Sequence, residues 1–368
     1  MMRYLISLLL TCVFLSVSYG QNNLTLRWEK VAPGIWKTTI GALEQIDLLR
    51  AAGAKPRMNE LSALGENGPN FDFKQIEAER FDGKTILRFP LLEDEKIYGL
   101  GLNFKTVNQR GKIKELHVDH FGGDDNGRTH APVPFFVSDK GYGVFLNSSR
   151  YIKISVGCIV RRDAKRLPPV IDRNVGENWD ANPPSDVLEA AIPGSGMEVY
   201  IFEGPDMLKV VQRFNLFCGG GFIPPKWGLG FSYRFPTLSS DKNVVSEIEQ
   251  FQKHNFPLSV IGLEPGWQSM SYPCTFEWDK NRFPNPVKFV NEMTEKGIHV
   301  NLWLNPYISP KSSCYEKLKQ LSGSHLVWNG IVPDYSLSKA QDIFKNFLKK
   351  EHVDLGISGY KMDEVDGF

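Results

Sequence analysis

Short apolar runs separated by turn residues dominate the chain up to about residue 203. The runs are rich in Ile, Val, Phe and Tyr, and pairs such as Asp82-Gly83 and Pro193-Gly194 interrupt them. The clearest runs are Gly34–Thr39, Lys84–Phe89, Gly143–Leu146, Tyr151–Val156 and Gly196–Phe202. Many short strands with frequent Gly and Pro turns are typical of a β-sandwich. We therefore predict an all-β sandwich domain over residues 21–203.

The hydrophobic pattern changes after this region. Residues 204–224 are predicted to hold a linker helix that Gly219–Gly221 ends, and Pro224-Pro225 marks a domain boundary. Short apolar strands then alternate with amphipathic helices. The predicted strands are Trp227–Phe231, Leu258–Leu263, Ile298–Leu304 and Gly359–Asp363, and the predicted helices are Ser239–His254, Pro286–Lys296 and Ser338–Lys350. This alternation predicts the first half of a (β/α)8 TIM-type barrel over residues 225–368, so the fold class is all-β followed by α/β.

The first twenty residues have the pattern of a signal peptide. Arg3 gives a positive start, an apolar stretch runs from Leu5 to Val17, and small residues occupy the cleavage positions in Ser18-Tyr19-Gly20. The apolar stretch is too short for a membrane anchor. We expect export to the periplasm or the extracellular space, no membrane attachment after cleavage, and a mature terminus at Gln21. A lipid on Cys12 is the minor alternative.

Charge and cysteine content narrow the classes of partner. The formal net charge of +1 gives no electrostatic reason to expect nucleic acid. The cysteines form no CxxC pair, so the sequence lacks the ligand spacing that predicts a zinc site. Cys274 and Cys314 both fall in loops after predicted strands. They are either paired, as export would permit, or free half-buried thiols.

Polar side chains follow three of the predicted barrel strands. Glu264 comes after the second strand, Asn305 after the third, and Asp363 with Glu364 after the fourth. Because active sites of such barrels lie at the carboxyl ends of the strands, these residues are candidates for one site. Lys361 lies two residues before Asp363 and so points to the same side, where its charge would keep Asp363 ionised. A structural ion pair at a strand end is the alternative.

Several ordered motifs resemble those of glycoside hydrolase family 31, the retaining α-glycosidases. In chain order they are Ile97-Tyr98-Gly99-Leu100-Gly101, Asn108-Gln109-Arg110-Gly111, Pro132-Val133-Pro134-Phe135-Phe136, Gly141-Tyr142-Gly143-Val144-Phe145, Ile223-Pro224-Pro225-Lys226-Trp227-Gly228-Leu229-Gly230 and Lys361-Met362-Asp363. The first four are similar to the sandwich of that family, the fifth to its entry into the barrel, and the last to its nucleophile strand. The resemblance covers nearly all of the chain after residue 20.

The resemblance implies a hydrolase that cleaves terminal α-linked sugars of an oligosaccharide or glycoconjugate through a covalent glycosyl-enzyme, without a metal or organic cofactor. Asp363 is then the nucleophile. The implied substrate-binding residues are Glu264, Trp267, Trp303, Asn305, Lys361, Glu364 and Asp366. The acid/base carboxylate of the family lies after a later barrel strand, so the resemblance implies that this chain is an incomplete amino-terminal portion.

Two positions depart from the family pattern. Glu264 stands where Asp is usual, and Asp366 stands where Glu is common three positions after the nucleophile. The sugar and linkage therefore stay open among α-glucosides, α-xylosides and α-linked N-acetylgalactosamine. Two other functions also stay open: a non-catalytic carbohydrate-binding fragment or degenerate relative, and an α-transglycosylase on the same scaffold.

Overall fold

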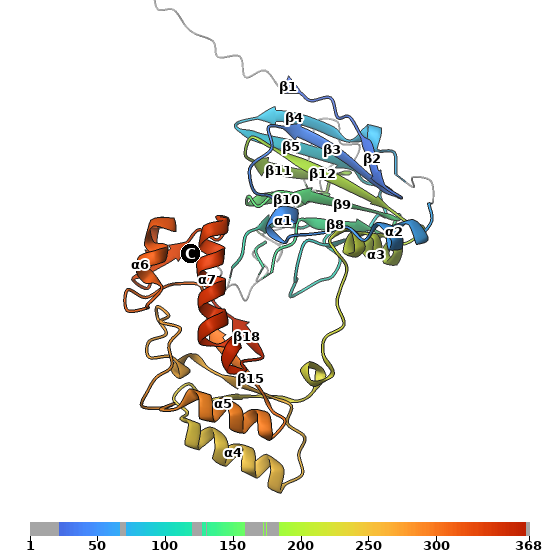
Figure 1. The fold of residues 1–368 in the computed structure, drawn as a ribbon. Helices are drawn as coiled ribbons and strands as arrows, with labels where there is room; N and C mark the ends of the chain where they lie inside the picture. Colours follow the sequence, from blue (N-terminus) through green and yellow to red (C-terminus); the bar gives the residue numbers. More distant parts are fainter. Residues whose placement is uncertain are drawn as a thin grey trace, which may run out of the picture. The chain divides into compact units, whose positions relative to one another are not determined.

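The computed structural model describes residues 22–66, 71–119, 127–129, 131–158, 172, 174 and 184–365, and Figure 1 shows its ribbon. The chain divides into two compact units. The first comprises residues 1–47, 62–116 and 133–213, and the second comprises residues 48–61, 117–132 and 214–368. The predicted signal peptide lies outside the described residues. Each unit has its own sheets.

The first unit is a sandwich of two antiparallel sheets. One sheet has the strand order β1 (Asn22–Asn23), β4 (Glu77–Phe81), β5 (Lys84–Pro90), β11 (Val187–Pro193), β10 (Ile152–Val156) and β7 (Ile113–Leu116). The other has the order β2 (Glu29–Ala32), β3 (Ile35–Gly41), β12 (Gly196–Glu203), β9 (Tyr142–Asn147), β8 (Phe135–Ser138) and β6 (Ile97–Gly99). The predicted sandwich is confirmed.

Alternating side chains of both sheets form the sandwich core. On β11, Leu188, Ala190 and Ile192 are buried, while the residues between them are half-exposed. They pack in one cluster with apolar residues of the other sheet, and the rings of Phe89 and Phe136 meet edge to face across it at 5.6 Å. A period of two is expected of strands that turn one face to the core and the other to solvent.

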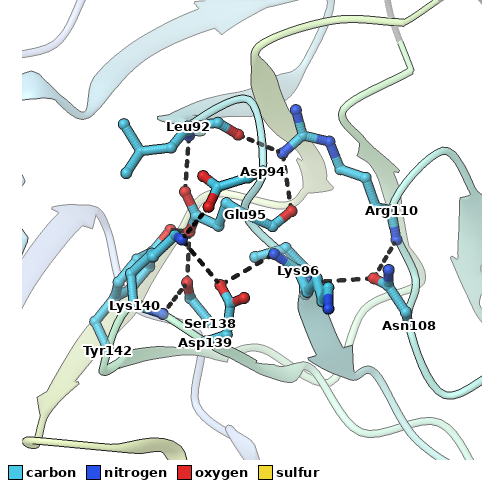
Figure 2. A network of polar contacts seen from close by, with 11 residues as sticks. Leu92, Asp94, Glu95, Lys96, Asn108, Arg110, Ser138, Asp139, Lys140 and Tyr142 are labelled. Carbon is cyan, nitrogen blue, oxygen red and sulfur yellow. Dashed lines mark hydrogen bonds and ion pairs between the residues drawn. The ribbon is translucent and has the colours of Figure 1, made fainter.

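A buried carboxylate organises the motif-bearing end of the sandwich (Figure 2). Glu95 accepts hydrogen bonds from the hydroxyls of Ser138 and Tyr142, both at 2.6 Å, and from the backbone N–H of Leu92 at 2.8 Å. Arg110 donates to the carbonyls of Leu92 and Glu95. Burial, followed by the charge of Glu95, raises the pKa of Tyr142 well above its usual value. These motif residues therefore stabilise the fold of this part of the sandwich.

Helices of the sandwich unit and its borders are short. They are α1 (Leu48–Ala51), α2 (Met58–Ala63), the 3-10 helix Phe73–Gln75 and α3 (Met207–Phe217). A helix was predicted over residues 204–224, and α3 forms its central part. Gly219 and Gly220 follow with positive φ angles, as the predicted glycine stop requires.

The second unit contains a four-stranded, all-parallel sheet in the order β13 (Ser232–Phe235), β14 (Val260–Leu263), β15 (His299–Leu304) and β18 (Gly359–Met362). Helices α4 (Asp241–Lys253), α5 (Pro286–Glu295) and α7 (Ser338–Glu351) follow the first three strands. Ser240 caps α4 with a capping box, and Asn285 caps α5. The succession is that of a partial TIM barrel, as predicted.

The predicted first barrel strand is misplaced. Residues 227–231 were predicted to be extended, but Lys226–Leu229 form a 3-10 helix and the strand begins at Ser232. Trp227 instead stacks on His299, with ring centroids 3.9 Å apart. The apolar run therefore lies just before the first strand of the sheet. That strand, β13, has an arginine, Arg234, in its middle.

Between β15 and α7 the chain forms structure that the sequence pattern did not predict. A helix α6 (Tyr315–Leu318) and a 3-10 helix Lys319–Leu321 precede an antiparallel hairpin of β16 (Ser322–Val327) and β17 (Gly330–Pro333). Trp328 and Asn329 form its turn with φ angles of 49° and 65°. Most of β16 is exposed and lacks a clear apolar alternation, so the sequence pattern gave little sign of a strand.

Candidate active site at the carboxyl ends of the barrel strands

The parallel register brings the candidate residues to one edge of the sheet. Leu263 of β14 pairs with Leu302 of β15, and Leu304 of β15 pairs with Met362 of β18. Glu264 and Asp363 therefore follow their strands at the same edge. A backbone hydrogen bond of 2.9 Å from the N–H of Asp363 to the carbonyl of Leu304 continues the ladder past β18.

Asp363 is a carboxylate of this edge that three donors hold. Its Oδ2 atom lies 2.9 Å from Nζ of Lys361 and accepts the indole N–H of Trp303 at 3.0 Å. Its Oδ1 atom accepts the backbone N–H of Glu364 at 3.1 Å. Burial opposes ionisation, but the donors outweigh it and lower the pKa of Asp363. Lys361 and Asp363 thus lie on the same side of the strand end, as their spacing predicted, and the direction of the pKa shift agrees with the expected effect of the ammonium.

Glu264 is the second carboxylate of this edge, and it is held by two cations. Its Oε1 atom accepts the Nε–H of Arg234, and its Oε2 atom lies 3.6 Å from Nζ of Lys361. The guanidinium also donates to Oδ1 of Asn301 at 3.1 Å. Arg234 was not among the candidates because its strand was predicted five residues too early. The sequence signal that could have identified Arg234 is a basic residue in the middle of β13, between apolar and aromatic neighbours.

The two tryptophans and the asparagine proposed to bind sugar lie inside the protein. Trp267, Trp303 and Asn305 are each no more than 1% exposed. Trp267 donates its indole N–H to the carbonyl of Trp303 at 2.7 Å, and Oδ1 of Asn305 accepts the Cys274 thiol and the N–H of Tyr307. Because they are buried, these side chains pack and hold the loops in place, and the tryptophan rings are not available for the stacking on sugar that was expected from the sequence. Of the three, Trp303 contacts Asp363 directly.

Glu364 and a group of aromatic side chains border Asp363. Glu364 has a left-handed φ of 52°, and its carbonyl accepts the hydroxyl of Tyr307 at 2.9 Å. Burial, and then the hydrogen bond to Glu364, raise the pKa of Tyr272. The ring of Tyr272 meets those of Trp303 and Trp328 at 5.4 and 4.9 Å, and Tyr272 is 46% exposed. An exposed tyrosine ring here offers the stacking surface that the buried tryptophans do not.

The aromatic residue from the hairpin was missed by sequence reasoning. Trp328 packs edge to face on Tyr272 and on Tyr307, which places the turn of the β16–β17 hairpin beside Glu364. Trp328 is more than 30 residues from Asp363 in sequence, and nothing in the local pattern links them. Asp366, the remaining candidate, lies outside the described residues.

The sequence left open whether Cys274 and Cys314 form a disulfide. Cys274 and Cys314 are both free and buried, so the possible disulfide between them is not formed. The thiol of Cys274 donates to Asn305, and that of Cys314 lies 3.2 Å from the hydroxyl of Ser312. Burial raises the pKa of Cys274 to about 11, and the thiol is therefore neutral at physiological pH.

The described ranges hold neither a cluster of potential metal ligands nor a long apolar helix. No three His, Cys, Asp or Glu side chains in those ranges converge as ligands for a metal ion. None of the helices that the structure describes has the length and apolar character needed to span a bilayer.

Family models match both units of the chain. The glycosyl hydrolases family 31 TIM-barrel domain matches residues 221–368, and the glycosyl hydrolase 31 N-terminal galactose mutarotase-like domain matches residues 54–154. This chain belongs to glycoside hydrolase family 31. The resemblance found in the sequence motifs is thereby confirmed, and so is the order of a sandwich followed by barrel strands.

Curated relatives of this family 31 chain are glycosidases. It is 29% identical over 283 residues to the α-xylosidase XylQ of Lactiplantibacillus pentosus, covering 73% of this chain and 34% of the relative. It is 26% identical over 295 residues to an α-xylosidase of Emericella nidulans, covering 76% and 34%. The chain thus spans about a third of the length of these relatives.

Solved structures share the fold. A family 31 dextranase of Flavobacterium johnsoniae, complexed with glucose, superposes with a TM-score of 0.66 at 17% identity, covering 93% of this chain and 47% of that one. An α-xylosidase from a soil metagenome, complexed with xylose, gives 0.64 at 15% identity, covering 94% and 57%. At these identities the likeness supports the architecture alone.

Proposed function

We propose that this chain is the amino-terminal part of an exported, retaining α-glycoside hydrolase that removes terminal α-linked sugars. The observation that carries the proposal is the environment of Asp363, a carboxylate at the carboxyl end of a barrel strand, with Lys361 at 2.9 Å and the Trp303 N–H at 3.0 Å on one oxygen. The family membership supports the reaction class, and the share of its relatives' length that the chain spans supports a longer polypeptide.

The chemistry required is attack of an ionised carboxylate on an anomeric carbon. Asp363 would form an ester bond to that carbon as the bond to the leaving oxygen breaks, and a second carboxylic acid would protonate that oxygen. Water would then attack the same carbon, break the ester and return a proton to the second carboxylate. Lys361 and Trp303 keep Asp363 ionised at the start and receive it when the ester is cleaved. The second carboxyl would come from barrel strands outside this chain.

The substrate we propose is an α-xyloside or an α-glucoside, because the relatives carry those names. We expect Glu264 to accept substrate hydroxyl groups chiefly through Oε2, because Oε1 already accepts the Nε–H of Arg234. Tyr272 supplies an exposed ring near the reacting centre for stacking of a sugar face.

Asp363→Asn in the full-length enzyme tests this function. Loss of the nucleophile should lower kcat by on the order of a thousandfold or more on 4-nitrophenyl α-xyloside and α-glucoside. Asn is nearly isosteric, so the fold should be unchanged by circular dichroism. Asp354→Asn, which alters an exposed ion pair with Lys349, is the matched control and should keep full activity.

The stereochemistry gives an independent test. In a time course followed by NMR, the α-anomer of the free sugar should appear first. Asp363→Gly should regain turnover with azide and release the β-glycosyl azide, because azide enters from the side that the carboxylate has left. An Asp363→Asn enzyme near full activity, or a β-anomer released first by the unmodified enzyme, would overturn the proposal.

A further inference from the structure

Arg234 belongs to a row of residues that lie side by side across the four parallel strands, and a glycine in this row leaves space for its side chain. The parallel register places Arg234 beside Gly262, Gly262 beside Asn301, and Asn301 beside Gly359. A Cβ atom at Gly262 would lie 2.5 Å from Nη1 of Arg234 and 2.8 Å from its Cζ. Glycine at this position therefore gives the guanidinium room to lie across β14 and reach the neighbouring strand.

The guanidinium makes two polar contacts from this row. Its Nε atom donates to Oε1 of Glu264, and its Nη1 atom donates to Oδ1 of Asn301 at 3.1 Å. Its Nη2 atom is buried and has no partner among the described residues. The fork geometry of arginine suits this double contact, which a lysine could make only in part.

The contacts continue from Glu264 to Asp363. Nζ of Lys361 lies 3.6 Å from Oε2 of Glu264 and 2.9 Å from Oδ2 of Asp363, so one ammonium is shared unequally between two carboxylates. Each carboxylate also has a donor of its own. Arg234 holds Glu264, and Trp303 holds Asp363.

We propose that Arg234 is a positioning residue for Asp363: by holding Glu264 in the adjacent row, it keeps Lys361 on Asp363. The inference rests on the proposed function of Asp363 as nucleophile. Without Arg234, Glu264 carries an uncompensated charge and competes for Lys361, so the ammonium moves toward Glu264. Asp363 then loses its nearest cation, which now pairs with Glu264.

Other titratable groups lie around Asp363 and Glu364. Tyr272, from the loop after β14, interacts with both carboxylates, whereas Cys274 of the same loop and Tyr307 of the loop after β15 interact with Glu364. Tyr272 and Cys274 stay neutral below pH 8 because burial raises the pKa of both. Changes in the titration of Asp363 over the acid range therefore report on the carboxylates and cations of this edge.

The test is Arg234→Gln in the full-length enzyme, with the Asp363 carboxyl titrated by NMR of ¹³C-carboxyl-labelled aspartate. The signal is assigned by its loss in Asp363→Asn. The pKa of Asp363 should rise by about one unit, since an opposite charge within a few ångströms lowers a carboxyl pKa by about 1–3 units. The acid limb of the kcat/KM profile should move by the same amount.

The double variant Arg234→Gln/Glu264→Gln separates competition from general damage. With both charges gone, Lys361 returns to Asp363, and the titration should fall back to within a few tenths of a unit of the unmodified enzyme. Arg234→Lys keeps the cation and should show less than half of the shift. Arg282→Gln removes an arginine that pairs with Asp279 and donates to the backbone carbonyls of Gly266 and Gln268, and it should leave the titration unchanged.

The outcomes distinguish this inference from the proposed function, because the carboxyl titration does not depend on turnover. An unchanged Asp363 pKa in Arg234→Gln overturns the inference, and so does a shift that the double variant fails to reverse. An enzyme that shows the shift and its reversal but hydrolyses no α-glycoside supports the positioning role and contradicts the proposed function.

Discussion

Replacement of Lys361 by Met should change the pH dependence of the reaction more than its rate at neutral pH. Nζ of Lys361 and Oδ2 of Asp363 are 2.9 Å apart. Two unit charges at that distance interact by about 1.4 kcal/mol in water and by about 6 kcal/mol at an effective dielectric constant of 20. The side chains are 39% and 30% exposed, so solvent screening places the loss at the lower end, about 1.4–3 kcal/mol.

This energy corresponds to a rise of about one to two units in the pKa of Asp363. The sign follows from the state that reacts. The pKa of Asp363 is lowered in the folded protein, so the ionised form is present above that pKa and is lost as the pH falls through it. Lys361→Met should therefore lose a larger share of its kcat/KM at pH 5 than at pH 7.

The assay is kcat/KM for 4-nitrophenyl α-xyloside between pH 3.5 and 8, in the full-length enzyme. Lys361→Arg keeps a cation and should leave the acid limb within about half a unit of the unmodified enzyme. An acid limb that does not move in Lys361→Met, with equal losses at pH 5 and pH 7, would show that Lys361 binds substrate without supporting the ionisation of Asp363.

Three further predictions concern other parts of the chain. Gly262→Ala should lower the free energy of unfolding in urea by about 1–3 kcal/mol, because its methyl group overlaps the side chain of Arg234. Gly228→Ala is the control: no atom lies closer than 3.8 Å to its methyl group, so the free energy of unfolding should change by less than about 1 kcal/mol. Equal losses in the two variants would refute the overlap. Glu264→Asp should change the ranking of aryl α-glycosides more than the best kcat; a uniform loss with unchanged ranking would indicate a structural role. The secreted protein should begin at Gln21 by mass spectrometry, and retention of the first twenty residues would contradict the predicted signal peptide.

Sequence patterns predicted the parts of the fold that depend on local periodicity. The short apolar runs of strands such as β5 and β12 and the start signals of α4 and α5 are short-range properties, and the structure has these elements where they were predicted. The strand that ends before Asp363 was equally clear, because a short run ending in two carboxylates is a local feature. The domain limits expected at residues 203 and 225 stay predictions.

The errors arose where distant residues decide the outcome. The run from Trp227 to Phe231 has the composition of a buried strand, but stacking of Trp227 on His299, more than 70 residues away, accompanies a 3-10 helix there. Trp267 follows a strand as a sugar-binding tryptophan would, yet its indole N–H has a buried partner in the carbonyl of Trp303. Such pairings need the three-dimensional register and cannot be deduced from one segment of sequence.

Trp303 has a consequence for how this part of the sheet could evolve. Its indole N–H is bonded to Asp363 and its carbonyl to Trp267, while its backbone pairs with Lys361 in the β15–β18 ladder. A slip of β18 by one residue would turn Asp363 to the opposite face and break the indole bond in the same step. If Asp363 is the proposed nucleophile, selection for its alignment is therefore also selection against slipped strand pairing. A substitution at Trp303 would relax both constraints together.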